Sequence, residues 1–401
     1  MSELPPGWML SRVGDAFDMQ LGKMLSKEAS SGGEQRCYLT NKNVQWNRLD
    51  FDAINFMSFD SAEREKFRLV RGDLLVTEGG EVGRTAMWEE ERSECYFQKS
   101  LHRLRSRGQI DPRFMLHYMH YAARRRMFTD SVGQTSIAHL PQDKFAKHLI
   151  MHPVDLAVQR RIVAAIDSVG EVERGIEASI AKLRSVRQGV LLDFMEKIAP
   201  EWKPVKEVGE VRMGKQLSPD SRAAGEQYPY LRVANVYAGH IDYSNVNYMS
   251  YSKAERKAYG LVPGDILLNE GQSLELVGRS AIYRKAPGAF FFQNTLIRFR
   301  CSEQVMPEYA QIVFEYWLRA GVFAAIAKQT TSIAHLGGGR FGALNFPLVS
   351  LSGQQTLVAS VASCDESLRT EADQLAKLRL LKRGLVDDLL TGRVAVSAVG
   401  G

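Results

Sequence analysis

The segment GDLLVTEGG at residues 72–80 occurs again, 192 positions later, as GDILLNEGQ at residues 264–272. Five other pairs of similar segments keep the same order in both halves of the chain, at offsets of 192 to 196. They are residues 38–44 with 230–236, 82–88 with 277–283, 97–105 with 292–300, 135–140 with 331–336, and 181–195 with 376–390. Such a repeat constrains the architecture more than local propensity does. We therefore predict two copies of one structural unit.

The overall composition is that of a folded globular protein. Hydrophobic residues make up 45% and charged residues 24% of the 401 residues, which excludes a disordered chain and favours two or more domains. The formal net charge of +6 suits a polyanionic partner without requiring one. The first ten residues do not resemble a secretion signal and no run of about 18 apolar residues occurs, so we expect a cytoplasmic protein without a membrane segment.

Each copy begins with a mixed globular part of roughly 150 residues. Short β-branched or aromatic runs such as LLVT and AFFFQNTLIRFR, separated by Gly, Asn and Asp, predict strands joined by turns. Residues 112–128 and 307–327 each open with Pro and continue without a helix breaker until near their ends, which predicts a helix in each copy.

A long helix follows each globular part. Its apolar residues recur every three or four positions, as in an amphipathic helix that packs on a partner helix. In the first copy they are Ile162, Ile166, Val169, Ile176, Ile180, Leu183, Val186 and Val190. In the second copy they are Leu357, Val361, Cys364, Leu375, Leu378, Leu381 and Leu385. A helix of about 40 residues is roughly 60 Å long, more than its own domain can cover, so we expect the two helices to cover each other.

The order of these motifs, found twice, resembles the specificity subunit of type I restriction-modification systems over essentially the whole chain. The motifs are an early Trp followed by Val-Gly, the G-D-[LI]-L block, a V-G-R turn, a Pro before a Gln-led helix, and a closing DDLLTGRV. The early motif consists of Trp8, Val13 and Gly14 in the first copy and of Trp202, Val208 and Gly209 in the second.

The resemblance implies an α/β (α+β) fold with a pseudo-two-fold internal repeat. Two mixed α/β target-recognition domains alternate with two long helices that pair as an antiparallel coiled coil. The implied segments are 1–153 for the first recognition domain, 154–199 for the first long helix, 200–347 for the second recognition domain, and 348–401 for the second long helix and tail.

The resemblance also implies the function and the partners. Each recognition domain is expected to read one half of a bipartite site in double-stranded DNA, and the helices to set the spacer and help dock adenine methyltransferase subunits, normally two. S-adenosylmethionine would be bound by those subunits, and a restriction and motor subunit would add cleavage. A specificity subunit of a type IIB-like system would look almost the same. A coiled-coil interaction protein without a DNA role would instead lack salt-dependent affinity for duplex DNA.

Motifs for catalysis, cofactors or metals are not found in the sequence. No Asp or Asn precedes Pro-Pro and an aromatic residue, as an amino-methyltransferase requires, and NFPL at Asn345 is read as a strand entering a helix. The Gly337, Gly338, Gly339 run lacks the Gly-Lys-Ser/Thr of a phosphate loop and is expected to be a flexible turn. We expect no catalytic residue, cofactor or metal site in this chain, and no enzyme activity of its own.

Neither the paired glutamates nor the cysteines indicate catalysis or metal binding. Glu78 and Glu270 follow strands in both copies and are equally consistent with accepting a base amino proton and with stabilising a turn. The four cysteines are widely separated, which predicts ordinary buried or half-buried thiols rather than a zinc site or a disulfide framework.

Polar residues shared by both copies are candidates for phosphate contacts or for the scaffold, because two domains reading different sequences share both. They are Asn43 with Asn235, Arg84 with Arg279, Gln98 with Gln293, Arg103 with Arg298, Arg105 with Arg300, Ser136 with Ser332, and His139 with His335. For the arginines, phosphate contact and a solvated strand face are weighed equally. For the two histidines, a hydrogen-bonded core or turn position is favoured.

Positions that differ inside matched segments are the candidate base readers. They are Thr40 against Arg232, Lys42 against Ala234, Lys99 against Asn294, and Gln134 against Thr330. Arg and Lys suit guanine, and Asn suits adenine, in the major groove. The Arg124, Arg125, Arg126 cluster belongs to the first copy alone and is either a phosphate-binding face or a charged helix end.

Overall fold

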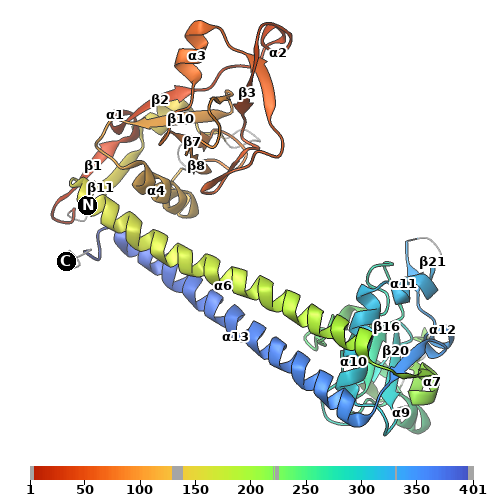
Figure 1. Ribbon diagram of the computed structural model, residues 1–401. Helices are drawn as coiled ribbons and strands as arrows, with labels where there is room; N and C mark the ends of the chain where they lie inside the picture. Colours follow the sequence, from red (N-terminus) through yellow and green to blue (C-terminus); the bar gives the residue numbers. More distant parts are fainter. Residues whose placement is uncertain (1–3, 129–138, 220, 222–224, 330–331, 396–401) are drawn as a thin grey trace. The chain divides into compact units, whose positions relative to one another are not determined.

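The computed structural model describes residues 4–128, 139–219, 221, 225–329 and 332–395 (Figure 1). The chain divides into two compact units, which are described separately. The first unit contains residues 1–178 and 373–401, and the second contains residues 179–372. Each unit therefore combines one globular domain with part of each long helix. Among the described residues, no helix has the length and apolar character needed to span a membrane.

The globular domain of the first unit is built on a four-stranded antiparallel sheet. Its strand order is β2 (Phe17–Leu21), β10 (Leu101–Ser106), β7 (Leu74–Thr77) and β8 (Thr85–Met87). A second sheet contains β6 (Asn55–Ser58), β3 (Gln35–Leu39) and β9 (Tyr96–Phe97), with β3 and β9 parallel. Two pairs of strands complete the domain: β1 (Trp8–Arg12) with β11 (Leu149–Pro153), and β4 (Val44–Gln45) with β5 (Arg48–Leu49). The helices are α1 (Val13–Ala16), α2 (Lys27–Ser31), α3 (Ser61–Phe67), α4 (Pro112–Arg124) and α5 (Gln142–Lys147).

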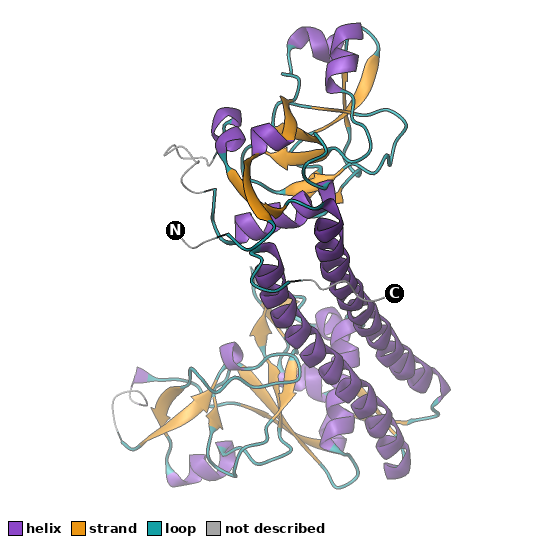
Figure 2. Cartoon of the chain, turned by 90° about the vertical axis from the view of Figure 1, so that its left-hand side faces the viewer, coloured by secondary structure: helices purple, strands orange, loops and turns teal. Residues whose placement is uncertain are grey.

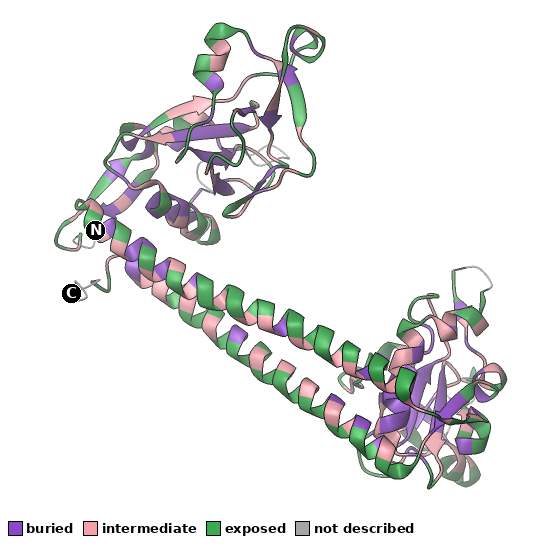
Figure 3. Ribbon diagram, in the orientation of Figure 1, coloured by how far each residue is buried: buried purple, intermediate pink, exposed green. Residues whose placement is uncertain are grey.

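The inner strands of the first unit's central sheet, β10 and β7, are largely buried (Figure 3). Successive strand residues point to opposite faces, so Leu74 and Val76 join one apolar cluster while Leu75 joins another. The first cluster also contains Leu389 and Leu390 from the second long helix. This two-sided burial explains why β7 is apolar without alternation.

The second unit repeats this plan. Its four-stranded sheet has the order β13 (Gly209–Met213), β20 (Leu296–Cys301), β16 (Ile266–Asn269) and β18 (Ser280–Ile282). Its other strands are β15 (Asn247–Ser250), β14 (Gln227–Leu231) and β19 (Phe291–Phe292) in one sheet, β17 (Gly271–Gln272), β22 (Ala334–His335) and β21 (Lys328–Gln329) in another, and the pair β12 (Glu201–Pro204) with β23 (Asn345–Leu348). Its helices are α7 (Val205–Val208), the 3-10 helix η2 (Val233–Asn235), α9 (Lys253–Tyr259), α10 (Pro307–Arg319), α11 (Val322–Ile326) and α12 (Gly338–Gly342).

The long helices are α6 (Leu156–Lys197) and α13 (Leu351–Leu390). They run antiparallel within each unit (Figures 1 and 2). In the first unit, Glu173 pairs with Arg379 and Lys382. In the second, Arg187 of α6 pairs with Asp365 of α13. Later residues of α6 thus meet earlier residues of α13, which confirms the expected antiparallel coiled coil.

Most of the predicted apolar stripe lies at the helix interface or against a domain core, including Ile162, Ile166 and Val361. Two members of the stripe do not. Val186 is 45% exposed and its counterpart Leu381 is 70% exposed. Periodicity identifies an apolar face but cannot tell whether a neighbour within the same chain covers it.

The motifs that identify the repeat have structural roles in both copies. Asp73 of the G-D-L-L block is completely buried, accepts a hydrogen bond from the Val70 backbone at 2.9 Å and pairs with Arg105. The Gln of the Gln-led helix is also buried: Gln159 accepts from the Asp111 backbone at 2.8 Å and donates to the Pro153 carbonyl at 2.8 Å. These buried polar groups tie turns and helix starts to the domain, which explains their recurrence.

The structure changes the ends of the two predicted helices and the interpretation of the glycine run. The helix predicted from Pro112 ends at Arg124, and the helix from Pro307 is broken after Arg319 by Gly321, whose φ of +74° is left-handed. The prediction of a flexible turn at the three glycines was wrong, because Gly337 caps the short helix α12. The prediction that NFPL is a strand entering a helix is confirmed by β23.

Candidate nucleic-acid interface

Three loops converge at one end of the first domain's sheets: residues 40–43, 78–84 and 98–100, called here the first reading loops. Backbone and side-chain hydrogen bonds join them. The Asn41 amide donates to the Ser100 hydroxyl at 3.1 Å, and the Glu78 amide donates to the Ser100 carbonyl at 3.0 Å. Arg84 donates to the Asn41 carbonyl at 2.8 Å. The loops therefore form one surface although they are far apart in sequence.

The second domain has the same arrangement at residues 232–235, 270–279 and 293–295, called here the second reading loops. The Val233 amide donates to the Thr295 hydroxyl at 3.2 Å, and the Glu270 amide donates to the Thr295 carbonyl at 2.9 Å. The Glu270 carboxylate lies 3.0 Å from Nδ1 of His335. His335 lies in strand β22, and this contact gives its ring a hydrogen-bonded partner. His139, its counterpart, is exposed beside Gly79.

The candidate base readers differ in their exposure. Lys42 and Lys99 are exposed on the first reading loops, and Ala234 is exposed on the second. Arg232 and Asn294 are half-buried, and Arg232 lines a surface depression. Thr40 is half-buried and its hydroxyl donates to the Asn43 side chain at 3.0 Å. Gln134, Thr330 and Ser136 lie outside the described residues.

Asn43 and Asn235 belong to the scaffold. Each is 2% exposed. The Asn43 amide donates to the carbonyls of Asp50 and Ala53, both at 2.9 Å, and its oxygen accepts from the Thr40 amide at 2.9 Å. Asn235 makes the three equivalent bonds. Because these groups are buried and satisfied, they shape the reading loops and are not available to DNA.

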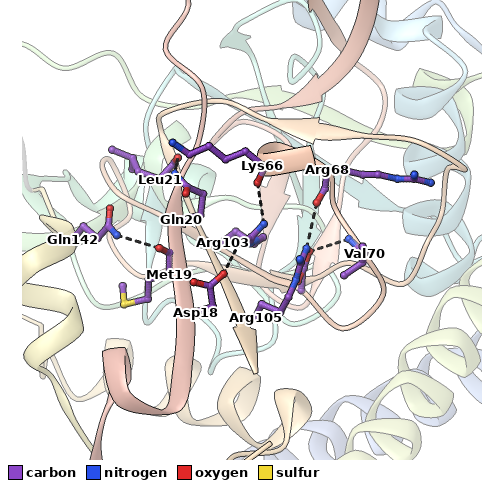
Figure 4. Close-up of polar contacts among 11 residues, drawn as sticks. Asp18, Met19, Gln20, Leu21, Lys66, Arg68, Val70, Arg103, Arg105 and Gln142 are labelled. Atoms are coloured by element: carbon purple, nitrogen blue, oxygen red, sulfur yellow. Dashed lines mark hydrogen bonds and ion pairs between the residues drawn. The ribbon is translucent and has the colours of Figure 1, made fainter. Parts of the chain in front are cut away.

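The paired arginines of β10 are also scaffold residues (Figure 4). Arg103 is 5% exposed, pairs with Asp18 at 2.7 Å and donates to the Lys66 carbonyl at 3.1 Å. Burial lowers the pKa of the Arg103 guanidinium, and neighbouring Arg105 adds to this effect. Arg105 forms a bidentate pair with Asp73 at 2.7 and 2.8 Å.

The second copy keeps both pairs. Arg298 bonds Glu210 at 2.7 Å, and Arg300 bonds Asp265 at 2.6 Å. These four arginines therefore have a structural role instead of the phosphate contact considered from the sequence, because each guanidinium is already held by a carboxylate of its own domain.

The remaining shared arginine pair lies at the reading loops. Arg84 has 18% of its side chain exposed and pairs with Glu81 of its own loop at 3.3 Å, while its bond to the Asn41 carbonyl at 2.8 Å joins two loops. Its counterpart Arg279 lies over the ring of Tyr237 at 4.8 Å, and that ring stacks on His240. The two copies thus use the same arginine in different local contacts.

The arginine cluster at the end of α4 faces the second long helix. Arg124 and Arg125 both pair with Asp387, the latter at 2.6 Å. The two ion pairs join the first domain to α13 within the first unit. Arg124 and Arg125 therefore make an intramolecular contact instead of the phosphate-binding face considered from the sequence.

One shared feature was missed in the sequence. Lys23 donates to the Ser58 carbonyl at 2.7 Å, and Lys215 donates to the Ser250 carbonyl at 2.8 Å. Each lysine also pairs with a glutamate and follows a glycine packed against a backbone carbonyl. The Gly-Lys pairs at 22–23 and 214–215 share the offset of 192, so the repeat contained the signal.

The exposed charged residues among the candidate base readers are cations, Lys42 and Lys99. No group of three or more His, Cys, Asp or Glu side chains suited to a metal ion occurs among the described residues. The described cysteines are free thiols.

Comparison with known proteins gives the class of the molecule. The family described as "Type I restriction modification DNA specificity domain" matches twice, at residues 5–182 and 200–380. The chain belongs to this family. The resemblance to this family that was inferred from the sequence motifs is confirmed. Sequence-specific DNA recognition for a type I system is favoured over the type IIB-like alternative.

Particular relatives agree with this assignment. The chain is 23% identical over 340 residues, 78% of its length and 72% of the relative's, to the type I restriction enzyme EcoKI specificity subunit of Escherichia coli K12. It is 26% identical over 166 residues, 41% of its length and 39% of the relative's, to the putative MjaX specificity subunit of Methanocaldococcus jannaschii.

Solved structures share the fold. A chain from a type I restriction-modification system has a TM-score of 0.67 at 16% identity, with 98% of this chain and 100% of that one covered. The specificity subunit from M. genitalium has a TM-score of 0.54 at 15% identity, covering 95% and 96%. The subunit from Thermoanaerobacter tengcongensis has a TM-score of 0.53 at 17% identity, covering 98% of each chain.

Proposed function

We propose that each unit reads one half of a bipartite DNA site through its reading loops. The observation that carries this proposal is a shared buried scaffold beneath different surface side chains. Asn43 and Asn235 hold loops of the same form, whereas the surface positions differ, as in Lys99 against Asn294. Two domains that bind the same backbone but different bases require this pattern.

The reading loops offer suitable groups for both kinds of contact. Lys42, Lys99 and Arg232 suit guanine or phosphate, and Asn294 suits adenine. Arg279 can reach a phosphate if it leaves the Tyr237 ring. Gln134 and Thr330 remain candidate readers on sequence grounds.

The long helices are proposed to set the spacer and to help dock methyltransferase subunits. Because α6 and α13 each contribute to both units, their length is the natural determinant of the distance between the half-sites. Val186 and Leu381, at equivalent positions of the repeat, are apolar and exposed on these helices.

The wider complex is proposed to contain two methyltransferase subunits, which bind S-adenosylmethionine, and restriction and motor subunits that supply cleavage. This chain then contributes recognition and no catalytic group, in the cytoplasm. The membership of the chain in the specificity-domain family supports this division.

Methylation-sensitive sequencing tests the proposal. DNA is compared from cells with the neighbouring methyltransferase gene, with and without this chain. The expected result is a split motif, methylated at adenine in both halves, that appears only with the chain. Lys99→Ala and Asn294→Ala should each relax recognition in a different half. A continuous motif would contradict the two-unit reading, and no chain-dependent motif in an assembled complex would contradict DNA reading itself.

A further inference from the structure

A cavity of about 370 Å³ lies within the first unit, between α4 and the two long helices. Of the described residues that line it, five are Arg or Lys and two are Asp or Glu, and one of the five cations, Arg124, is held by Asp387 outside the lining. Lys382 and Arg379 share the Glu173 carboxylate, at 2.8 Å each. Burial opposes ionisation of Glu173, but hydrogen bonds from these two cations outweigh it and lower the pKa. The lining keeps an excess of positive charge.

The internal repeat shows what this cavity lacks. The counterpart of Lys382 in the second unit is Arg187, which pairs with Asp365 at 2.6 Å and with Glu315 at 3.1 Å. The Arg187 side chain is only 13% exposed, so the second unit closes this position with a cation held between two carboxylates.

Both carboxylates are missing from the first unit. At the offset of 195, Asp365 corresponds to Gly170 and Glu315 corresponds to His120. A Cβ on Gly170 would lie 3.4 Å from Nζ of Lys382 and 3.6 Å from Nη1 of Arg174. The space occupied by a carboxylate in the second unit is therefore flanked here by two cationic groups.

We propose that this cavity binds a phosphate-bearing ligand, whose oxygens take the place of the missing carboxylates. Guanidinium groups bind phosphate oxygens through paired hydrogen bonds, and Arg174 and Arg383 both line the cavity. The cavity is larger than a single carboxylate requires. His120, which stacks on Trp46 at 4.8 Å, adds an aromatic edge suited to a nucleotide base. The phosphate comes either from a free nucleotide or from the DNA backbone.

Isothermal titration of the full chain with pyrophosphate and with ADP at low ionic strength tests binding. Gly170→Asp restores the carboxylate of the second unit and should abolish binding. Arg383→Gln installs the residue of the equivalent position, Gln188, at an exposed site, and should weaken binding about tenfold because one charge-assisted contact is lost. The matched control, Arg369→Gln on the second unit's part of α13, should leave binding unchanged.

Duplex DNA distinguishes the two sources. If the ligand is the DNA backbone, pyrophosphate competes with duplex and Arg383→Gln lowers the slope of log affinity against log salt by about one. If it is a free nucleotide, duplex affinity is unchanged and ADP binds more tightly than pyrophosphate. Absence of binding by the parent chain, or binding that Gly170→Asp leaves intact, would overturn the proposal. Thermal unfolding of each variant establishes that it is folded.

Discussion

Replacing Asp73 by Asn should destabilise the first unit while leaving the second intact. The Asp73 carboxylate has no exposed surface, and it bonds Arg105 twice, at 2.7 and 2.8 Å. These contacts, led by the hydrogen bonds, raise the pKa of Arg105. An amide of the same shape keeps one acceptor, removes the negative charge and turns an N–H toward the guanidinium.

The size of the effect follows from burial. Breaking a buried ion pair costs about 3–5 kcal/mol, and the lower end applies because 36% of the Arg105 side chain remains exposed to water. A loss of about 3 kcal/mol should lower the unfolding midpoint of a domain of this size by roughly 6–12 °C.

Hydrogen exchange localises the effect. Amides of β7 and β10 should exchange about a hundredfold faster, since 1.4 kcal/mol corresponds to about a factor of ten, while those of β16 and β20 are unchanged. Asp265→Asn should give the reverse pattern. Asp388→Asn in the first unit is the control: its side chain is 42% exposed and that of its partner Arg393 is 59% exposed, so the loss should stay below about 1 kcal/mol. Equal, small losses for Asp73→Asn and Asp388→Asn would refute the reasoning from burial.

Four other substitutions have defined outcomes. Gly214→Ala places a Cβ 2.1 Å from the Gln293 carbonyl oxygen and should cost about 1–3 kcal/mol in thermal unfolding, whereas Gly384→Ala, with open space around it, should stabilise its helix by about 0.5–1 kcal/mol. Lys99→Ala should lower the salt dependence of duplex binding by about one unit of slope in mobility-shift titrations; an unchanged slope would exclude a phosphate contact. A hydrogen bond from His117 lowers the pKa of Asp167, so its stabilisation is present above the unfolded pKa of about 3.9 and is lost as pH falls through the lower folded value. Below about pH 4, the free energy of unfolding should therefore fall less steeply with decreasing pH for Asp167→Asn than for the parent chain. Equal slopes for the two proteins would contradict this.

The duplication, the mixed domains and the paired long helices followed from the sequence because each depends on a repeated or periodic pattern. The roles of individual arginines did not. In FQKSLHRLR, Lys99 and Arg103 are both basic, yet Lys99 is exposed and Arg103 faces Asp18 of another strand. Lys99 lies in the loop before β10 and Arg103 lies within β10, and a strand buried on both faces has no polar alternation to show that its basic residue points inward.

The same limit applied to partners distant in sequence. Arg124 and Arg125 meet Asp387, which lies on the second long helix, and no local pattern announces such a pair. The exposed Val186 and Leu381 show the converse case. Their periodicity was clear, but the described part of the chain leaves both of them exposed.

The apolar cluster that joins Leu389 and Leu390 to the first domain has a consequence for the order of folding. Domains generally fold as they leave the ribosome, beginning with the N-terminal one. Here the residues of the second unit, 179–372, are all synthesised before the first unit has received its last ones, 373–401. The core of the first domain therefore remains incomplete during synthesis until Leu389 and Leu390 have been added, after the residues of the second unit have been made. A chain that ends between residues 372 and 385 should consequently lose recognition by the first domain and keep the second domain intact.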